Sequence, residues 1–120
     1  MKISKLALGL FPIALASPAM VSPASAQSVP SDVRCLLLSN LFSKKAEAEQ
    51  ARQVAAQSLI FYLGRLDGRV NPRALEAAMR SQSAAVDPKA AGPEMTACAA
   101  RLAHAQQTVQ ALGRAAAPTK

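Results

Sequence analysis

The chain has no tryptophan, one histidine, one tyrosine and two cysteines in 120 residues. The lone histidine, His104, and two cysteines cannot supply the three or four ligands of a typical zinc site. Among the seven acids, only Glu47 and Glu49 are close in sequence, and side chains two residues apart on a helix do not face each other. No serine has the G-x-S-x-G setting of a hydrolase nucleophile. The sequence therefore predicts no catalytic residue, metal site or cofactor, and no enzyme.

Strand-like alternation of apolar and polar residues is also missing, and no segment repeats. Alanine, leucine, glutamine and arginine, which favour helices, are abundant instead. Prolines and glycines divide the chain into four helical pieces. The fold class expected from this pattern is all-α, a small four-helix bundle.

The N-terminal segment has the layout of a secretory signal peptide. Residues 1–5 carry two lysines, residues 6–16 (LALGLFPIALA) are apolar, and residues 17–26 are small and end in Ala-Ser-Ala. A membrane anchor is the alternative, but the apolar run is about half of the ~20 residues that a spanning helix needs. We expect cleavage between Ala26 and Gln27, export to the periplasm, and no transmembrane segment after cleavage.

Removing residues 1–26 from the 120-residue chain leaves 120 − 26 = 94 residues, enough for one domain. The domain is expected over residues 27–114, with a flexible C-terminal tail at residues 115–120. Without the two lysines of the signal, 12 basic residues face seven acids, a net charge of +5. Because the basic residues are scattered, we expect no nucleic-acid partner. Solubility or weak attraction to the anionic envelope is the plainer consequence.

Cys35 and Cys98 are expected to form a disulfide. An isolated pair of cysteines in an oxidising compartment usually bonds to itself, and two free buried thiols are the alternative. A redox site usually has its cysteines close in sequence, unlike these two. The bridge would join the first helix to the fourth and stabilise this small domain by about 4 kcal/mol.

The first helix is expected from an N-cap at Ser31 to near Ser43, and it is apolar nearly all round, which predicts burial on several sides. The second helix is expected over residues 45–66. Its apolar residues recur at steps of three and four: Ala51, Val54, Ala55, Leu59, Tyr62, Leu63 and Leu66. Gly64 lies inside this helix, where a glycine suggests the close approach of another backbone.

The third helix is expected to start at an Asn71 N-cap with Pro72 in its first turn. Its inner face is predicted to hold Leu75, Ala78, Met79 and Gln82. The fourth helix is expected from Pro93, after a loop. Its apolar residues form a heptad seam: Met95, Cys98, Leu102, Ala105, Val109 and Leu112. Such a seam could pair with a second copy of the chain as readily as with its own helices.

The segment FYLGRLDG at residues 61–68 resembles part of a calcium or phosphate loop, but its register fails. With Gly68 as the central glycine, a calcium loop would place Leu63, Arg65 and Ala74 where oxygen ligands are required. A phosphate loop needs a lysine after its glycines. The segment is instead predicted to be a helix end, with Gly68 in the left-handed conformation.

Three aromatic residues, Phe42, Phe61 and Tyr62, belong to the exported chain. We expect them in the core or at its edge. The alternative is that they provide an apolar contact surface for a ligand or an unfolded segment.

The segments CLLLSNLF, FYLGRLDG and MTACAARL, behind a signal peptide, resemble those of short uncharacterised exported proteins of alphaproteobacteria, particularly sphingomonad-type ones. This resemblance implies two-cysteine helical proteins and no particular activity. A looser likeness is to the periplasmic acid-stress chaperones, which are small, helical and exported, with one disulfide. The sequence departs from them by its few acids and its abundant alanine.

The function expected from the sequence is a non-enzymatic periplasmic helical protein that acts by protein contact, in envelope maintenance or chaperone-like binding. Its expected partners are other periplasmic proteins or a second copy. The alternative is a small carrier that holds an apolar ligand between its helices.

Overall fold

The computed structural model describes residues 28–119, and its described residues form four helices and no strand. They are α1 (Val29–Lys45), α2 (Glu49–Leu66), α3 (Pro72–Ala84) and α4 (Pro88–Ala116). The prediction of an all-α, four-helix fold is confirmed. The predicted signal peptide and its cleavage site at Ala26 and Gln27 lie outside the described residues.

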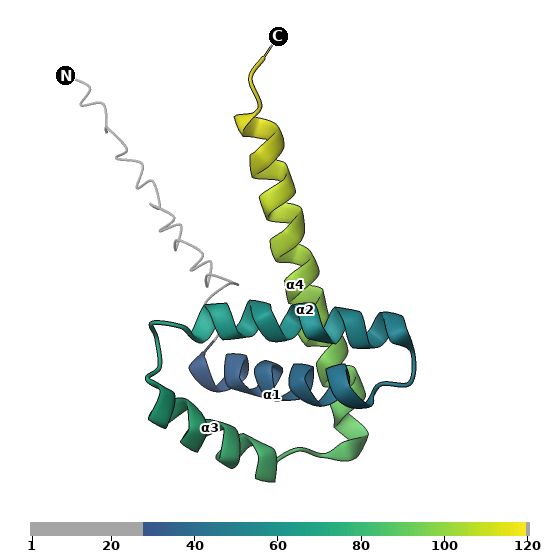
Figure 1. The fold of residues 1–120 in the computed structure, drawn as a ribbon, viewed down its shortest axis with the longest axis vertical. Coiled ribbons are helices and arrows are strands. Elements are labelled where there is room, and N and C mark those ends of the chain that lie inside the picture. Colours follow the sequence, from purple (N-terminus) through teal and green to yellow (C-terminus); the bar gives the residue numbers. More distant parts are fainter. Residues whose placement is uncertain (1–27, 120) are drawn as a thin grey trace, which may run out of the picture.

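Helix α1 is the centre of the fold. Figure 1 shows it between α2 and α3, with α4 crossing both α1 and α2, and α1 contacts each of the other helices. The helix is buried on several sides, as the sequence predicted, and its buried residues are Asp32, Val33, Cys35, Leu36, Leu38 and Ser39. The helix begins earlier than expected, because Ser28 caps it by accepting a hydrogen bond from the backbone of Ser31. Pro30 fits in the first turn because no hydrogen bond is needed from its nitrogen there.

Helix α2 packs along α1, but its buried face differs from the predicted one. Ala55, Tyr62 and Leu66 are buried and Leu59 is half-buried, while Ala51, Val54 and Leu63 are exposed. The periodicity suggested a wider inner face because it cannot show which part of an apolar stripe its neighbours cover. Ser58, not expected in the core, is buried instead.

One glycine lies inside α2 and another lies just after its end. Gly68 has a φ of 76°, so the FYLGRLDG segment is a helix end, as predicted. The expectation for Gly64 is wrong: a Cβ built on this residue would meet nothing within 4 Å. No other backbone of the described chain approaches it.

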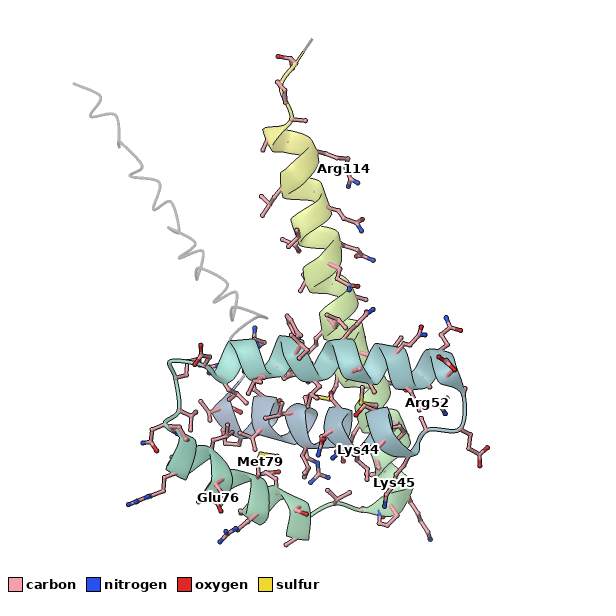
Figure 2. The ribbon with its side chains drawn as sticks, in the orientation of Figure 1. Lys44, Lys45, Arg52, Glu76, Met79 and Arg114 are labelled. Atoms are coloured by element: carbon pink, nitrogen blue, oxygen red, sulfur yellow. A yellow bond between two sulfur atoms is a disulfide. The ribbon has the colours of Figure 1, made fainter. Side chains whose placement is uncertain are left out.

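Helix α3 begins as the sequence predicts. Asn71 caps it by accepting a hydrogen bond from the Ala74 backbone, and Pro72 occupies its first turn. The half-buried residues of α3 are the four predicted for its inner face: Leu75, Ala78, Met79 and Gln82. Figure 2 shows Met79 extending from α3 toward α1, and Met79 packs against the core.

Helix α4 is longer than predicted at both ends. It begins at Pro88 rather than Pro93, because Asp87 caps it and accepts a hydrogen bond from the Lys89 backbone. Pro93 lies inside the helix. Pro93 has no N–H to donate to the carbonyl oxygen of Lys89, four residues earlier. Both residues are exposed, so water can bond to that carbonyl instead. The helix continues past Gly113 to Ala116, into the first residues of the expected tail.

The predicted disulfide is confirmed. The Sγ atoms of Cys35 and Cys98 are 2.02 Å apart, with a Cα–Cα distance of 5.5 Å. The bond joins the buried middle of α1 to the first half of α4, where Met95 and Leu102 are also buried. It therefore fixes α4 at the point where that helix crosses the body of the domain.

Candidate functional site

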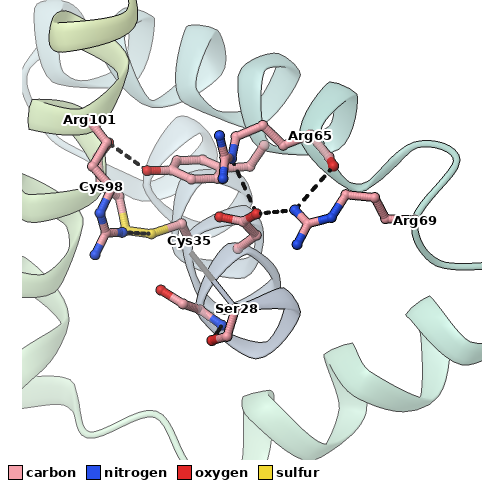
Figure 3. Close-up of polar contacts among 9 residues, drawn as sticks. Ser28, Cys35, Arg65, Arg69, Cys98 and Arg101 are labelled. Carbon is pink, nitrogen blue, oxygen red and sulfur yellow. Dashed lines mark hydrogen bonds and ion pairs between the residues drawn. A yellow bond between two sulfur atoms is a disulfide. The ribbon is translucent and has the colours of Figure 1, made fainter. Parts of the chain in front are cut away.

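Among residues 28–119, the one fully buried charged side chain is Asp32, in the first turn of α1, with 0% exposure. Arg65 and Arg69 reach it from the end of α2, with nitrogen–oxygen distances of 3.2 and 2.7 Å (Figure 3). Arg65 lies in the last turn of α2 and Arg69 in the turn that follows Gly68, so the end of the helix brings both to the same carboxylate. This ion-pair network joins the start of α1 to the end of α2.

A second polar contact joins α2 to α4 beside the disulfide. The buried Tyr62 hydroxyl donates a hydrogen bond of 2.8 Å to the carbonyl oxygen of Cys98. Arg101 Nη1 lies 3.0 Å from Cys35 Sγ. Burial raises the pKa of the Tyr62 hydroxyl above its ordinary 10.0, while Arg101 acts in the opposite direction.

The Tyr62→Phe variant should lose the hydrogen bond to Cys98 and unfold with about 1 kcal/mol less free energy at neutral pH. Because the folded-state pKa of Tyr62 is raised, its stabilising contribution is present below pH 10 and is lost as the pH rises through that pKa. Stability of the parent should therefore fall more steeply than that of Tyr62→Phe in alkaline solution. Urea unfolding at several pH values checks this.

The chain's single tyrosine offers a direct control, since ultraviolet absorbance reports its ionisation alone. Tyr62 should ionise at a higher pH in the native protein than in the denatured protein. Equal titration curves in the two states would contradict the assignment of a buried, neutral hydroxyl.

A third polar contact joins α1, α3 and α4. The guanidinium of Arg34 makes two hydrogen bonds to the carboxylate of Glu94, at 2.7 and 3.1 Å, and a third to the carbonyl oxygen of Gln82. The three polar contacts link helices to each other. Their geometry accounts for cohesion of the bundle and does not require a ligand.

The histidine and the two neighbouring acids singled out in the sequence lie on the surface of residues 28–119. No group of three or more His, Cys, Asp or Glu side chains in that range could hold a metal ion. His104 is exposed on α4, and Glu47 and Glu49 are exposed near the start of α2. Glu47 and Glu49, the two acids that are close in sequence, are therefore surface residues.

The strongest candidate for a binding surface is an open groove between the end of α1, the start of α2 and the first half of α4. We call it the Phe42 groove. Its lining residues are Phe42, Ala48, Gln50, Ala51, Val54, Gly92, Met95, Thr96 and Ala99. None of these side chains is charged, and Val54 is 36% exposed. A Cβ on Gly92 would meet nothing within 4 Å, which is consistent with open space at that point of the groove.

The loop beside this groove is held in place. Arg52 Nη1 donates hydrogen bonds of 2.9 Å to the carbonyl oxygens of Ala46 and Glu47. Figure 2 shows Arg52, Lys44 and Lys45 at the corner where α1 leads into α2. The groove therefore has a largely apolar, uncharged lining, and residues of both signs lie near one end, with Glu49 paired to Arg52.

A second exposed apolar region lies at the other end of α2. Ile60 is 68% exposed, and Leu63 is also exposed. Both residues line a shallow groove toward the start of α3, together with Val70, Pro72 and Leu75. Sequence analysis placed Leu63 on the inner face, so this surface was not expected.

The second half of α4 extends away from the body of the domain (Figure 1). We call residues 103–116 the α4 arm. The predicted heptad seam is thus divided: Met95, Cys98 and Leu102 are buried, while Val109 and Leu112 are 68% and 64% exposed. The sequence identified the apolar face of α4 but could not show that the described residues leave half of this face uncovered.

The three aromatic residues occupy different settings. Tyr62 is fully buried, so the core interpretation holds for it. Phe61 is half-buried, with its ring 4.9 Å from that of Tyr62 and the Arg65 guanidinium 5.7 Å from its centre. Phe42 is half-buried and lines the groove. Of the three residues proposed for apolar contact, Phe42 is the one that lines the Phe42 groove.

Comparisons with known proteins give no match to a family model, a curated protein or a solved structure. None of the helices within residues 28–119 combines the length and the apolar character needed to cross a bilayer.

Proposed function

We propose that this chain is an exported, non-enzymatic helical protein of the bacterial periplasm that acts by protein contact. Its role would be chaperone-like binding or envelope maintenance. The Phe42 groove is the observation that carries the proposal. It is open, apolar and formed by three helices that the disulfide and the polar contacts hold together.

The chemistry of the groove favours an apolar protein segment over an ionic ligand. Its lining has no charged side chain, so it offers neither a counter-ion for a charged ligand nor a set of metal ligands. Methionine adapts its shape to varied apolar partners, and Met95 lies in the wall of the groove.

The proposed location rests on three features. The sequence has the layout of a signal peptide, the two cysteines are bonded to each other, and structural disulfides belong mainly to oxidising compartments. Export by a signal peptide would deliver the chain to the periplasm in that oxidised form.

The client-binding proposal is tested by placing a charge in the groove. Val54→Glu should weaken the suppression of aggregation of a thermally unfolding client protein several-fold, because a partly exposed carboxylate is costly to bury under an apolar segment. Light scattering during heating of the client measures the effect.

Ala56→Glu is the matched control, since it adds the same charge to an exposed site on the same helix that does not line the groove. It should suppress aggregation as well as the parent does. Equal activity of Val54→Glu and Ala56→Glu would contradict the assignment of the groove, and inactivity of the parent would contradict the chaperone-like role.

The carrier alternative has the same apolar lining in its favour. It requires a small apolar molecule to remain with the protein through purification. Native mass spectrometry of the chain recovered from a periplasm distinguishes the two functions, because a carrier would show the added mass of its ligand.

A further inference from the structure

We propose that the α4 arm is a self-association site at which two copies of this chain pair their arms in antiparallel orientation. The inference stands apart from the proposed function, since the arm and the Phe42 groove share no residue. It rests on the pattern of the arm, on its charge and on the space around α4.

The first observation is the continuity of the seam. Met95, Cys98 and Leu102 are the buried contacts of α4 with the body, and the same heptad spacing continues through the arm as Ala105, Val109, Leu112 and Ala116. A sustained heptad repeat is typical of a helix that packs against another helix along its whole length. In the body the chain itself provides that partner, and the rest of the seam lies in the projecting arm.

The second observation is the lack of packing along the arm. Most helical stability in proteins comes from packing of an apolar face, and Gly113 lowers helix propensity by about 1 kcal/mol relative to alanine. From Gln106 onward, every described residue of the arm is exposed. Pairing with another helix would supply the packing that such a segment needs.

Identical arms are complementary to each other. The seam reads Ala105, Val109, Leu112, Ala116, that is, small, large, large, small. In an antiparallel pair, Val109 faces Leu112 of the second copy, and Ala105 faces Ala116 of the second copy. The large residues then fill the centre, and the alanines let the backbones approach at both ends.

Charge does not oppose this pairing. Arg114 is the only Lys, Arg, Asp or Glu in residues 103–116, and its heptad position is opposite the seam. Figure 2 shows Arg114 extending outward from the arm. The residues that flank the seam are Gln106, Thr108, Gly113 and Ala115, so two basic chains can approach here without like charges meeting.

The space around α4 selects the antiparallel orientation. A parallel partner would continue along the seam past Leu102, where α1 and α2 of the first copy already cover Cys98 and Met95. An antiparallel partner runs the other way, so the two bodies lie at opposite ends of the paired arms. Its C-terminal end would then approach the side of the body from which the arm projects.

The expected dimer is weak. Residues 105–116 span roughly 17 Å of helix, and such a pair covers less than the ~800 Å² per partner of a standard stable interface. Sedimentation velocity of the purified, oxidised chain should therefore show a monomer that converts to a dimer as the concentration is raised. A monomer at every concentration would overturn the proposal.

Variants locate the interface. Val109→Glu and Leu112→Glu should each weaken the dimer at least about tenfold, because each substitution enters the interface twice. Both sites are exposed, so the fold should be retained, and circular dichroism checks this. Gln107→Glu, which adds the same charge on the opposite side of the arm, is the control and should dimerise like the parent.

A double variant tests the orientation. In V109E/L112K, an antiparallel pair places the new glutamate of each copy against the new lysine of the other, so the dimer should form again. A parallel pair would place glutamate against glutamate and lysine against lysine. A V109E/L112K chain that stays monomeric, or a dimer that resists Val109→Glu, would overturn the proposed pairing.

Discussion

Loss of the Cys35–Cys98 bond is expected to lower the free energy of unfolding by about 4 kcal/mol, the largest effect of any change considered for this protein. The two residues are 63 positions apart, and in the chain-entropy model a loop of this length restricts the unfolded ensemble by about that amount. Domains of this size are commonly stable by only 5–15 kcal/mol. The bond therefore accounts for a large share of the stability.

The structure indicates which part of the fold should suffer most. Apart from the bond, α4 is held to the body by its buried side chains, by the hydrogen bond from Tyr62 and by the ion pair between Arg34 and Glu94. Helix α1 keeps its contacts with α2 and α3 without the bond. Protection of α4 amides from hydrogen exchange should consequently fall more than that of α1 amides.

The measurement compares the parent with Cys35→Ala/Cys98→Ala by urea unfolding, followed by far-ultraviolet circular dichroism because the chain has no tryptophan. A reducing agent should destabilise the parent to a similar extent and leave the double variant unchanged. If the bond stabilises the fold by less than about 1 kcal/mol, the two helices are held together chiefly by packing, contrary to this expectation.

Replacement of Asp32 by alanine is expected to cost about 3 kcal/mol, the second largest effect. The carboxylate has 0% exposure and pairs with Arg65 and Arg69, and removal of one partner from a buried ion pair commonly costs 3–5 kcal/mol. The lower end of that range applies because the arginine side chains are 30% and 40% exposed and can regain contact with water.

Two further variants separate the causes. Asp32→Asn keeps the volume of the side chain and removes its charge. Its free energy of unfolding should therefore lie between that of the parent and that of Asp32→Ala. Asp67→Asn changes an exposed acid at the end of α2 and should alter the stability by less than about 0.5 kcal/mol. An Asp32→Ala cost as small as that of Asp67→Asn would show that the network acts like a surface ion pair.

The sequence predicted best those features that depend on neighbours along the chain. The Asn71 cap, the left-handed Gly68 and the four inner-face residues of α3 follow from spacing and from local backbone chemistry. Burial on several sides of α1 followed from apolar residues that lie nearly all round this helix. The Cys35–Cys98 pairing followed because the chain offers no other pair.

Local signals in the sequence were insufficient where two residues were equally suitable as the start of a helix. Pro88 and Pro93 can each occupy the first turn of a helix, and the cap provided by Asp87 decides for Pro88. Ser28 and Ser31 are both good N-cap residues, and the helix starts at the earlier one. An acid before Pro88 was the available signal for the correct start of α4.

The sequence by itself determined the helical class, the inner face of α3 and the covalent link, because local periodicity and the number of cysteines are properties of the chain alone. Only the tertiary structure decided which apolar residues are covered. It placed Arg65 and Arg69 around Asp32, exposed Val54 and Leu63, and left Val109 and Leu112 in a projecting arm. The physical reason is that an apolar stripe requires a partner surface without specifying it. Where α4 crosses α1 and α2, the second half of its stripe has no cover from residues 28–119.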